Sequence, residues 1–150
     1  MAKFKCEGIE LYIDQLQKLG DRTASVMKKG TYDGAAIVAD EVKKRLRSVI
    51  RHPDESTGAL INSMFLAKIE SSKGYTYTEI GFAGYDPSRE PSKGYPHGVP
   101  NVIKARAMES GTSKQRKTPF IRPAFNAAKE KCMEAMQKTV DNEIKKIMED

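Results

Sequence analysis

Tryptophan is absent from this sequence, aromatic residues are few, and only two cysteines occur. Cys6 and Cys132 lie far apart and neither belongs to a CxxC pair, so we predict two buried thiols in a reducing compartment, with a long-loop disulfide as the alternative. No apolar run approaches the ~18 residues that a membrane helix needs. The opening Met-Ala-Lys-Phe-Lys leads into no apolar stretch, which indicates no secretory signal. The sequence therefore predicts a protein with no membrane association that stays where it is made.

Histidine is also scarce, and the motifs of the common catalytic and metal sites are missing. Both histidines, His52 and His97, stand beside prolines in expected loops, and no HExxH, GxSxG or P-loop pattern occurs. Asp54 and Glu55 are neighbours in a loop, which does not by itself build an acid–base pair. We therefore predict no enzyme, no cofactor and no metal site. A small hydrolase that uses His97 and Asp86 is the weakest alternative.

The formal net charge of +6 suggests a negatively charged partner. Basic residues concentrate in two runs. These runs are Lys43, Lys44, Arg45, Arg47 and Arg51, and then Lys114, Arg116, Lys117 and Arg122. Neither run is interleaved with aromatic residues that could stack on bases. A solvated helix face is the favoured interpretation of the first run, and contact with phosphate or with an acidic protein surface is the alternative.

The N-terminal third predicts a short strand followed by helices. Residues 2–7 alternate weakly between apolar and polar side chains, which suggests the strand. Residues 9–19 form an amphipathic helix that Gly20 ends. A second helix is predicted over 22–51, either kinked or broken near residues 30–34, because interior glycines are unfavourable in helices, or continuous through them. The apolar stripe of the first helix comprises Ile9, Tyr12, Ile13, Leu16 and Leu19.

The middle of the chain predicts a β-hairpin. Residues 59–63 form a short turn, and strands follow over 64–70 and 75–82. Alternate residues of the second strand make two faces. One face comprises Thr76, Thr78, Ile80 and Phe82, and the other comprises Tyr75, Tyr77 and Glu79. Because both faces carry large side chains, we expect each to be at least partly covered.

A loop and a long helix complete the chain. Four prolines and three glycines within residues 84–100 exclude regular structure, so we predict a flexible loop that a partner orders on binding. Residues 101–110 are helical or extended. The longest helix is predicted from Pro123 to Met148, because proline suits a first helical turn and apolar residues follow at helical spacing. Its stripe comprises Phe125, Ala128, Cys132, Met136, Val140, Ile144 and Ile147.

These elements predict one domain over residues 1–150. The expected fold class is α+β, with a small, mainly antiparallel sheet packed against two or three helices and a long C-terminal helix. A chain of this length buries roughly two-thirds of its unfolded surface. Since tryptophan is absent, the core depends on leucine, isoleucine, valine, alanine and methionine.

The most distinctive stretch lies between the last two predicted helices. It reads Glu109-Ser110-Gly111-Thr112-Ser113-Lys114-Gln115, followed by Thr118-Pro119-Phe120-Ile121-Arg122-Pro123-Ala124-Phe125. It resembles the signature of the tailed-phage neck proteins often called gp-ten-like, which are head–tail joining or tail-completion proteins. The opening GIELYIDQLQKLG, the alanine-rich second helix, and Thr57-Gly58-Ala59-Leu60 with Ser63 agree in order. Ser110 departs from the pattern, because the family usually has an aromatic residue there.

The resemblance implies a structural virion protein of a phage or prophage. Such a protein completes the neck as a ring, of six subunits in the particle, and binds itself, the head-closure or connector proteins and the tail proteins. It is found in the virion neck or tail, and in the host cytoplasm during assembly. The assembly residues carried over from the motif are Glu109, Gly111, Thr112, Ser113, Pro119, Phe120, Arg122 and Pro123. Separately from the resemblance, their clustering in the sequence makes Lys114, Arg116 and Lys117, together with Arg122, candidates for contact with passing DNA or an acidic partner.

The same residues also have a local interpretation. Gly111 permits a backbone conformation that is closed to other residues, and Thr112 or Ser113 can bond the local backbone. Phe120 and Phe125 are expected to wedge the last helix onto the sheet. The rival function is a basic nucleic-acid-binding module, which the net charge and the first basic run favour.

Overall fold

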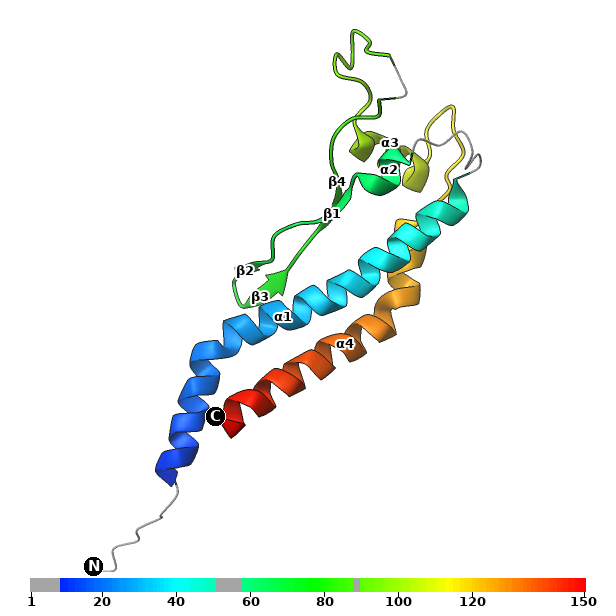
Figure 1. The fold of residues 1–150 in the computed structure, drawn as a ribbon. Coiled ribbons are helices and arrows are strands. Elements are labelled where there is room, and N and C mark those ends of the chain that lie inside the picture. The colour runs from blue at the N-terminus through cyan, green and yellow to red at the C-terminus, as the bar shows by residue number, and fades with distance from the viewer. Residues whose placement is uncertain (1–8, 51–57, 88–89) are drawn as a thin grey trace, which may run out of the picture.

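The computed structural model describes residues 9–50, 58–87 and 90–150. In chain order the elements are α1 (Ile9–Val49), α2 (Ala59–Asn62), β1 (Met64–Leu66), β2 (Glu70–Ser72), β3 (Tyr75–Tyr77), β4 (Ile80–Phe82), α3 (Asn101–Ser110) and α4 (Ile121–Glu149). Figure 1 shows an elongated molecule in which α1 and α4 run side by side in opposite directions. The strands and short helices lie against the C-terminal half of α1. The predicted α+β class is confirmed, and the strand predicted over 2–7 lies outside the described residues.

The N-terminal helix is continuous, so the predicted stop at Gly20 is wrong. A glycine inside a helix costs about 1 kcal/mol relative to alanine, which is too little to end a helix that packs against α4 from Gly30 onward. Figure 1 shows α1 changing direction in its N-terminal half. In this part the Thr23 hydroxyl donates to the Leu19 carbonyl at 2.7 Å, a bond four residues back that often bends helices. With 41 residues α1 exceeds the 29 of α4, so the C-terminal helix is not the longest.

The glycines near residues 30–34 do not break α1 but let α4 approach it. Both Gly30 and Gly34 are buried. A Cβ at Gly34 would lie 2.5 Å from Cγ of Met136, and one at Gly30 would lie 2.9 Å from Cγ2 of Val140. Because glycine has no side chain, the two helices can approach each other closely at these two positions.

This difference between glycines of one helix can be tested. Gly20→Ala is expected to stabilise the chain by about 1 kcal/mol, because nothing lies within 4 Å of the new Cβ. Gly34→Ala gains the same helix propensity but must displace Met136, so we expect a lower melting temperature. Thermal unfolding followed by circular dichroism measures both. Equal stabilisation by the two substitutions would contradict the close approach at Gly34.

The α4 helix buries most of its predicted stripe, with one exception. Ala128 and Ile147 are buried and the four stripe residues between them are half-buried, whereas Phe125 is 49% exposed. Ala124, outside the predicted stripe, is also buried. The prediction that Phe125 wedges the helix is wrong, because the inward positions of the first turns are taken by alanines four residues apart. Cys132 is a free, half-buried thiol, and burial raises its pKa. Cys6 lies outside the described residues.

The predicted hairpin is present but is divided into two short antiparallel pairs. Its inner pair is β2–β3, and its outer pair is β1–β4 with Met64 opposite Phe82. Between the pairs, residues 67–69 lie opposite residues 78–79, so one strand has one extra residue, as in a β-bulge. The amide of Ala67 still donates to the carbonyl of Glu79 at 2.8 Å. The bulge explains why sequence alternation predicted longer strands than the structure contains.

The two faces of the second strand are covered unequally. Phe82 is buried and Ile80 is half-buried on the inner face. On the outer face Tyr77 is 41% exposed and so partly covered, whereas Tyr75 is 76% exposed. The inner face joins a core built from both long helices, α3 and the outer strand pair. Its buried members are Val38, Ala39, Val42, Leu46, Met64, Phe82, Ala105, Phe120, Ala124 and Ala128.

Candidate assembly surface

The motif between α3 and α4 forms a clasp, in which Glu109 near the end of α3 caps the start of α4. The Glu109 carboxylate accepts hydrogen bonds from the backbone amides of Phe120 at 2.7 Å, Ile121 at 2.8 Å and Arg122 at 3.0 Å. The next residue, Pro123, has no amide hydrogen to satisfy. One side chain thus satisfies the otherwise unpaired donors of this helix end and also places a negative charge at the positive end of the helix dipole.

The charge of Glu109 follows from this environment. Burial of the carboxyl group raises its pKa, but the three backbone hydrogen bonds and the nearby Arg122 outweigh burial, so the pKa lies below its ordinary value. The carboxylate is therefore ionised across the neutral pH range. Glu109 acts here as an acceptor that joins two helices.

The turn that follows α3 has the conformation that its sequence predicts. Gly111 has φ of +76°, a region that disfavours residues with a Cβ. The Thr112 hydroxyl accepts hydrogen bonds from the amides of Gln115 at 3.0 Å and Lys114 at 3.3 Å, as expected for this residue type. The amide of Thr118 returns to the Met108 carbonyl at 2.7 Å. The segment is therefore closed on itself and held to the end of α3.

The remaining motif residues divide into a buried anchor and exposed positions. Phe120 has no exposed surface, and its ring meets Phe82 edge-on with centroids 6.1 Å apart. This confirms that Phe120 wedges α4 against the outer strand pair. Ser113, Pro119 and Arg122 are exposed, and Pro123 is half-buried in the first turn of α4.

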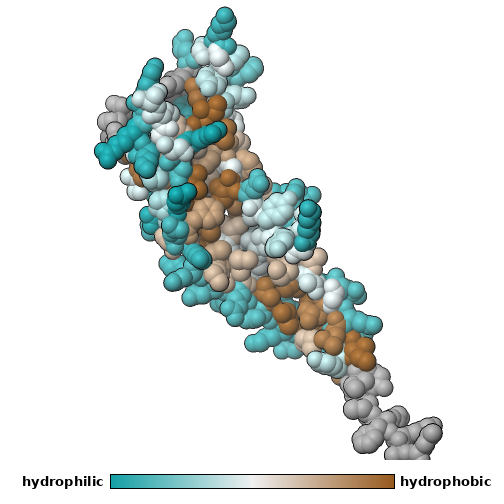
Figure 2. All heavy atoms as spheres, turned by 180° about the vertical axis from the view of Figure 1, so that it is seen from behind, coloured by the Kyte–Doolittle hydropathy of each residue, from teal (hydrophilic) through white to brown (hydrophobic). Residues whose placement is uncertain are grey.

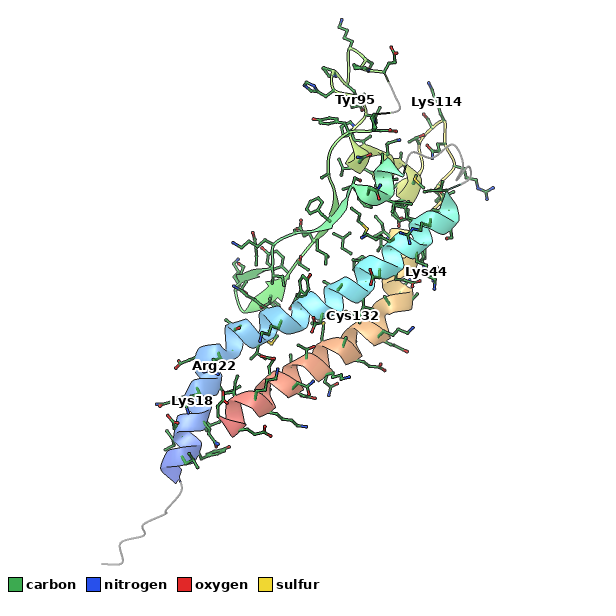
Figure 3. The ribbon with its side chains drawn as sticks, in the orientation of Figure 1. Lys18, Arg22, Lys44, Tyr95, Lys114 and Cys132 are labelled. Atoms are coloured by element: carbon green, nitrogen blue, oxygen red, sulfur yellow. The ribbon has the colours of Figure 1, made fainter. Side chains whose placement is uncertain are left out.

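The basic residues of the motif project into solvent from the clasp. Lys114, Arg116, Lys117 and Arg122 are all exposed, and none forms an ion pair with another residue in the part of the chain that the structure describes. Figure 3 shows Lys114 at the end of the molecule toward which Lys44 of α1 also lies. The Lys44 side chain is 81% exposed. We call Lys44, Lys114, Arg116, Lys117 and Arg122 the basic end; Arg51 lies outside the described residues.

The 84–100 segment has no helix or extended strand among its described residues, yet its base is tied down. Asp86 is buried and pairs with Lys104 of α3, and burial lowers the pKa of that lysine. The amide of Asp86 donates to Val99 and that of Asn101 donates to Gly84, both at 3.0 Å. These bonds join the two ends of the loop above α3.

The weakest alternative is a hydrolase that uses His97 and Asp86. In the structure each of these two residues contacts a different residue. The carboxylate of Asp86 is engaged by Lys104. His97 is exposed, as expected, and its ring lies against Tyr85 with centroids 5.8 Å apart. His52 lies outside the described residues.

An apolar hollow of about 270 Å³ opens beside the clasp. Its floor is formed by Phe82, Ala105 and Ile121, and Arg106 and Glu109 lie at its polar side. Ser110 also lines it. The position at which the resembled family has an aromatic residue therefore carries a small polar side chain at the edge of an open hollow.

Two of these features escaped sequence reasoning. Glu109 caps a helix that begins twelve residues later, whereas the familiar capping box spans three residues. No local pattern could reveal it. The Asp86–Lys104 pair joins a loop to a helix and also has no local signal, although an aspartate within a proline-rich loop was a visible candidate for an anchor.

The described residues contain no group of three or more histidine, cysteine or acidic side chains that could hold a metal ion. None of their helices is both long and apolar enough to cross a membrane. Comparison with protein-family models, with curated proteins and with solved structures found no match to this chain.

Proposed function

We propose that this chain is a structural subunit of the neck of a tailed phage or prophage, where it joins tail to head as a ring of copies. The single observation that carries the proposal is the clasp. The residues on which the family resemblance depends, Glu109, Gly111, Thr112 and Phe120, act together as one local structure that locks α3 to α4.

The surface around the clasp suits an assembly role. The basic residues lie on a segment that the clasp holds in place, so their charges are presented at a defined position without a flexible tether. A ring subunit in this place would face DNA as it passes or an acidic surface of a neighbouring ring. The proposed partners are therefore further copies of this chain, the connector or head-closure proteins, and the tail proteins.

Deletion of the gene from the phage or prophage that encodes it tests this function. The expected result is filled heads and free tails in electron micrographs, with infectivity restored when the wild-type chain is supplied in trans. Properly joined, infectious particles in the deletion strain would sink the proposal.

Charge reversal then tests the basic end. Lys114→Glu with Lys117→Glu is expected to complement poorly, by at least about tenfold in titre, since like charges placed against each other at an interface cost several kcal/mol. The matched control is Lys138→Glu with Lys145→Glu, two exposed lysines on α4, which should complement normally. Equal complementation by both pairs would remove the basic end from the mechanism.

A nucleic-acid-binding module is the second candidate, which the clustering of exposed cations at one end favours. Binding dominated by phosphate contacts weakens steeply as salt rises. A gel shift of the purified chain with random duplex DNA at two salt concentrations separates the two functions. Tight and strongly salt-sensitive binding by the isolated chain would favour the module, and weak binding would favour the neck subunit.

A further inference from the structure

The N-terminal part of α1 carries an apolar stripe that the described chain leaves open. Tyr12, Ile13 and Leu16 are 54%, 49% and 45% exposed, although their spacing places them on one face of the helix. Figure 2 shows apolar surface at this end of the molecule, next to the grey N-terminal residues. We call residues 11–19 the arm.

The arm extends the face on which α1 packs against α4. The side chain of Gln15 donates to the Met148 carbonyl at 2.7 Å, and Arg22 pairs with Asp150 at 3.7 Å. These contacts mark the level at which α4 ends. The same stripe that buries Val26 farther along therefore continues past the end of its partner helix. The packing of an apolar face supplies most of the stability of helices in proteins, so covering this stripe would stabilise the arm.

The hollow beside the clasp is an open, concave surface lined mainly by apolar side chains. Val102 at its edge is 54% exposed. The hollow lies between α3, β4 and the start of α4, at the end of the molecule away from the arm (Figure 1). The arm of a chain therefore does not reach its own hollow, and the two surfaces can meet only between copies.

The charges of both surfaces fit a copy of the same chain. From residue 11 to residue 22 the helix has two acidic residues, Asp14 and Asp21, and two basic ones, Lys18 and Arg22, so its net charge is zero. The hollow is flanked by one charge of each sign, Arg106 and Glu109. In a chain with net charge +6, these neutral surfaces avoid the repulsion that two basic ends would meet.

We propose that the arm of one copy docks in the hollow of the next, with Tyr12 or Leu16 occupying the space beside Ser110. The inference rests on the proposed ring. Because the two surfaces differ and lie at opposite ends, the contact is heterologous, and repetition of such a contact closes a ring when the rotation between copies permits. A contact of this size is weak for a single pair, so several contacts in a closed ring are needed for stability.

Cysteine cross-linking of the full chain tests this contact. Both native cysteines are first replaced, by Cys6→Ser and Cys132→Ala. Leu16→Cys and Val102→Cys are then introduced in separate chains. Both positions are exposed, so neither substitution leaves a cavity in the core. Equal amounts are mixed under mild oxidation. The expected product is a mixed disulfide dimer between the two variants. Mainly Leu16→Cys homodimers would show that arms pair with each other and would overturn the proposal, as would the absence of any cross-link.

Two controls keep the result specific. Lys138→Cys, exposed on α4, should cross-link to Leu16→Cys far less than Val102→Cys does; equal yields would overturn the proposal. Ser110→Phe should fill the hollow and reduce the mixed dimer by at least about tenfold, with the melting temperature unchanged or raised; an unchanged yield would also overturn it.

The cross-linking experiment and the deletion experiment can each contradict its own proposal without contradicting the other. The cross-link requires only purified copies of this chain, so its absence leaves the deletion phenotype untouched. If the cross-link forms normally but deletion of the gene leaves phage necks intact, the proposed function is wrong and the contact between copies stands.

Discussion

Replacing Phe120 with alanine is expected to lower the free energy of unfolding by about 3–5 kcal/mol. The ring has no exposed surface, and it packs edge-on against Phe82 where α4 meets the outer strand pair. The substitution removes the buried ring and leaves a cavity that helices on both sides keep open. Since small domains are stable by only about 5–15 kcal/mol, the loss should appear as a large drop in the urea midpoint.

Phe125→Ala is the matched control for this prediction. It changes the same residue type five positions later, inside α4 and not at the residue that precedes it, and at a site that is 49% exposed. The expected cost is below about 1 kcal/mol. If the two substitutions destabilise the chain equally, Phe120 is not the residue that holds α4 against the sheet.

Glu109→Gln is expected to cost about 2 kcal/mol at neutral pH. Glutamine retains one acceptor oxygen, which can still accept from the amides of Phe120 and Ile121 that share one carboxylate oxygen. Its NH2 group then replaces the oxygen that faces the amide of Arg122, and an NH2 group cannot accept that hydrogen bond. It also removes the negative charge from the start of α4. Glu130→Gln, at an exposed position on the same helix, should change the urea midpoint little.

The cost of Glu109→Gln should depend on pH with a definite sign. The pKa of Glu109 is lowered in the folded chain, while in the unfolded chain it is about 4.3. A carboxyl group of this kind stabilises the fold above its unfolded pKa and loses that contribution as pH falls through the folded pKa. The difference between wild type and variant should therefore be full near neutral pH and shrink in acid. A difference that is constant from neutral pH into acid would contradict the capping role of the carboxylate.

Local patterns predicted the elements whose residues interact with near neighbours in the chain. The period of α4 from residue 123 onward, the hairpin with its inner face of Ile80 and Phe82, and the turn at Gly111 all depend on contacts within a few residues. The structure confirms these predictions. The positions of Gly111 and Thr112 were predictable because backbone conformation and short-range hydrogen bonds follow directly from residue type.

The errors arose where a distant segment decides the outcome. Gly20 ends a helix by local rules, yet α1 continues through it because this small cost cannot end a helix that packs against α4 farther along. Phe125 has the spacing of a core residue, but α4 turns alanines inward there. The face of Tyr75 and Tyr77 was expected to be at least partly covered, which holds for Tyr77, but Tyr75 is 76% exposed. In each case the local preference is worth about 1 kcal/mol, and packing decides the result.

The sequence alone determined that this chain is an α+β domain with basic runs, a proline-rich loop and a compact motif before its last helix. Only the tertiary structure decided that Glu109 of one helix caps another, that glycines of α1 admit α4, and that the apolar stripe of the arm is left open. The physical reason is that propensity and periodicity act over a few residues, whereas capping across helices, close packing and exposed faces depend on which distant segments meet.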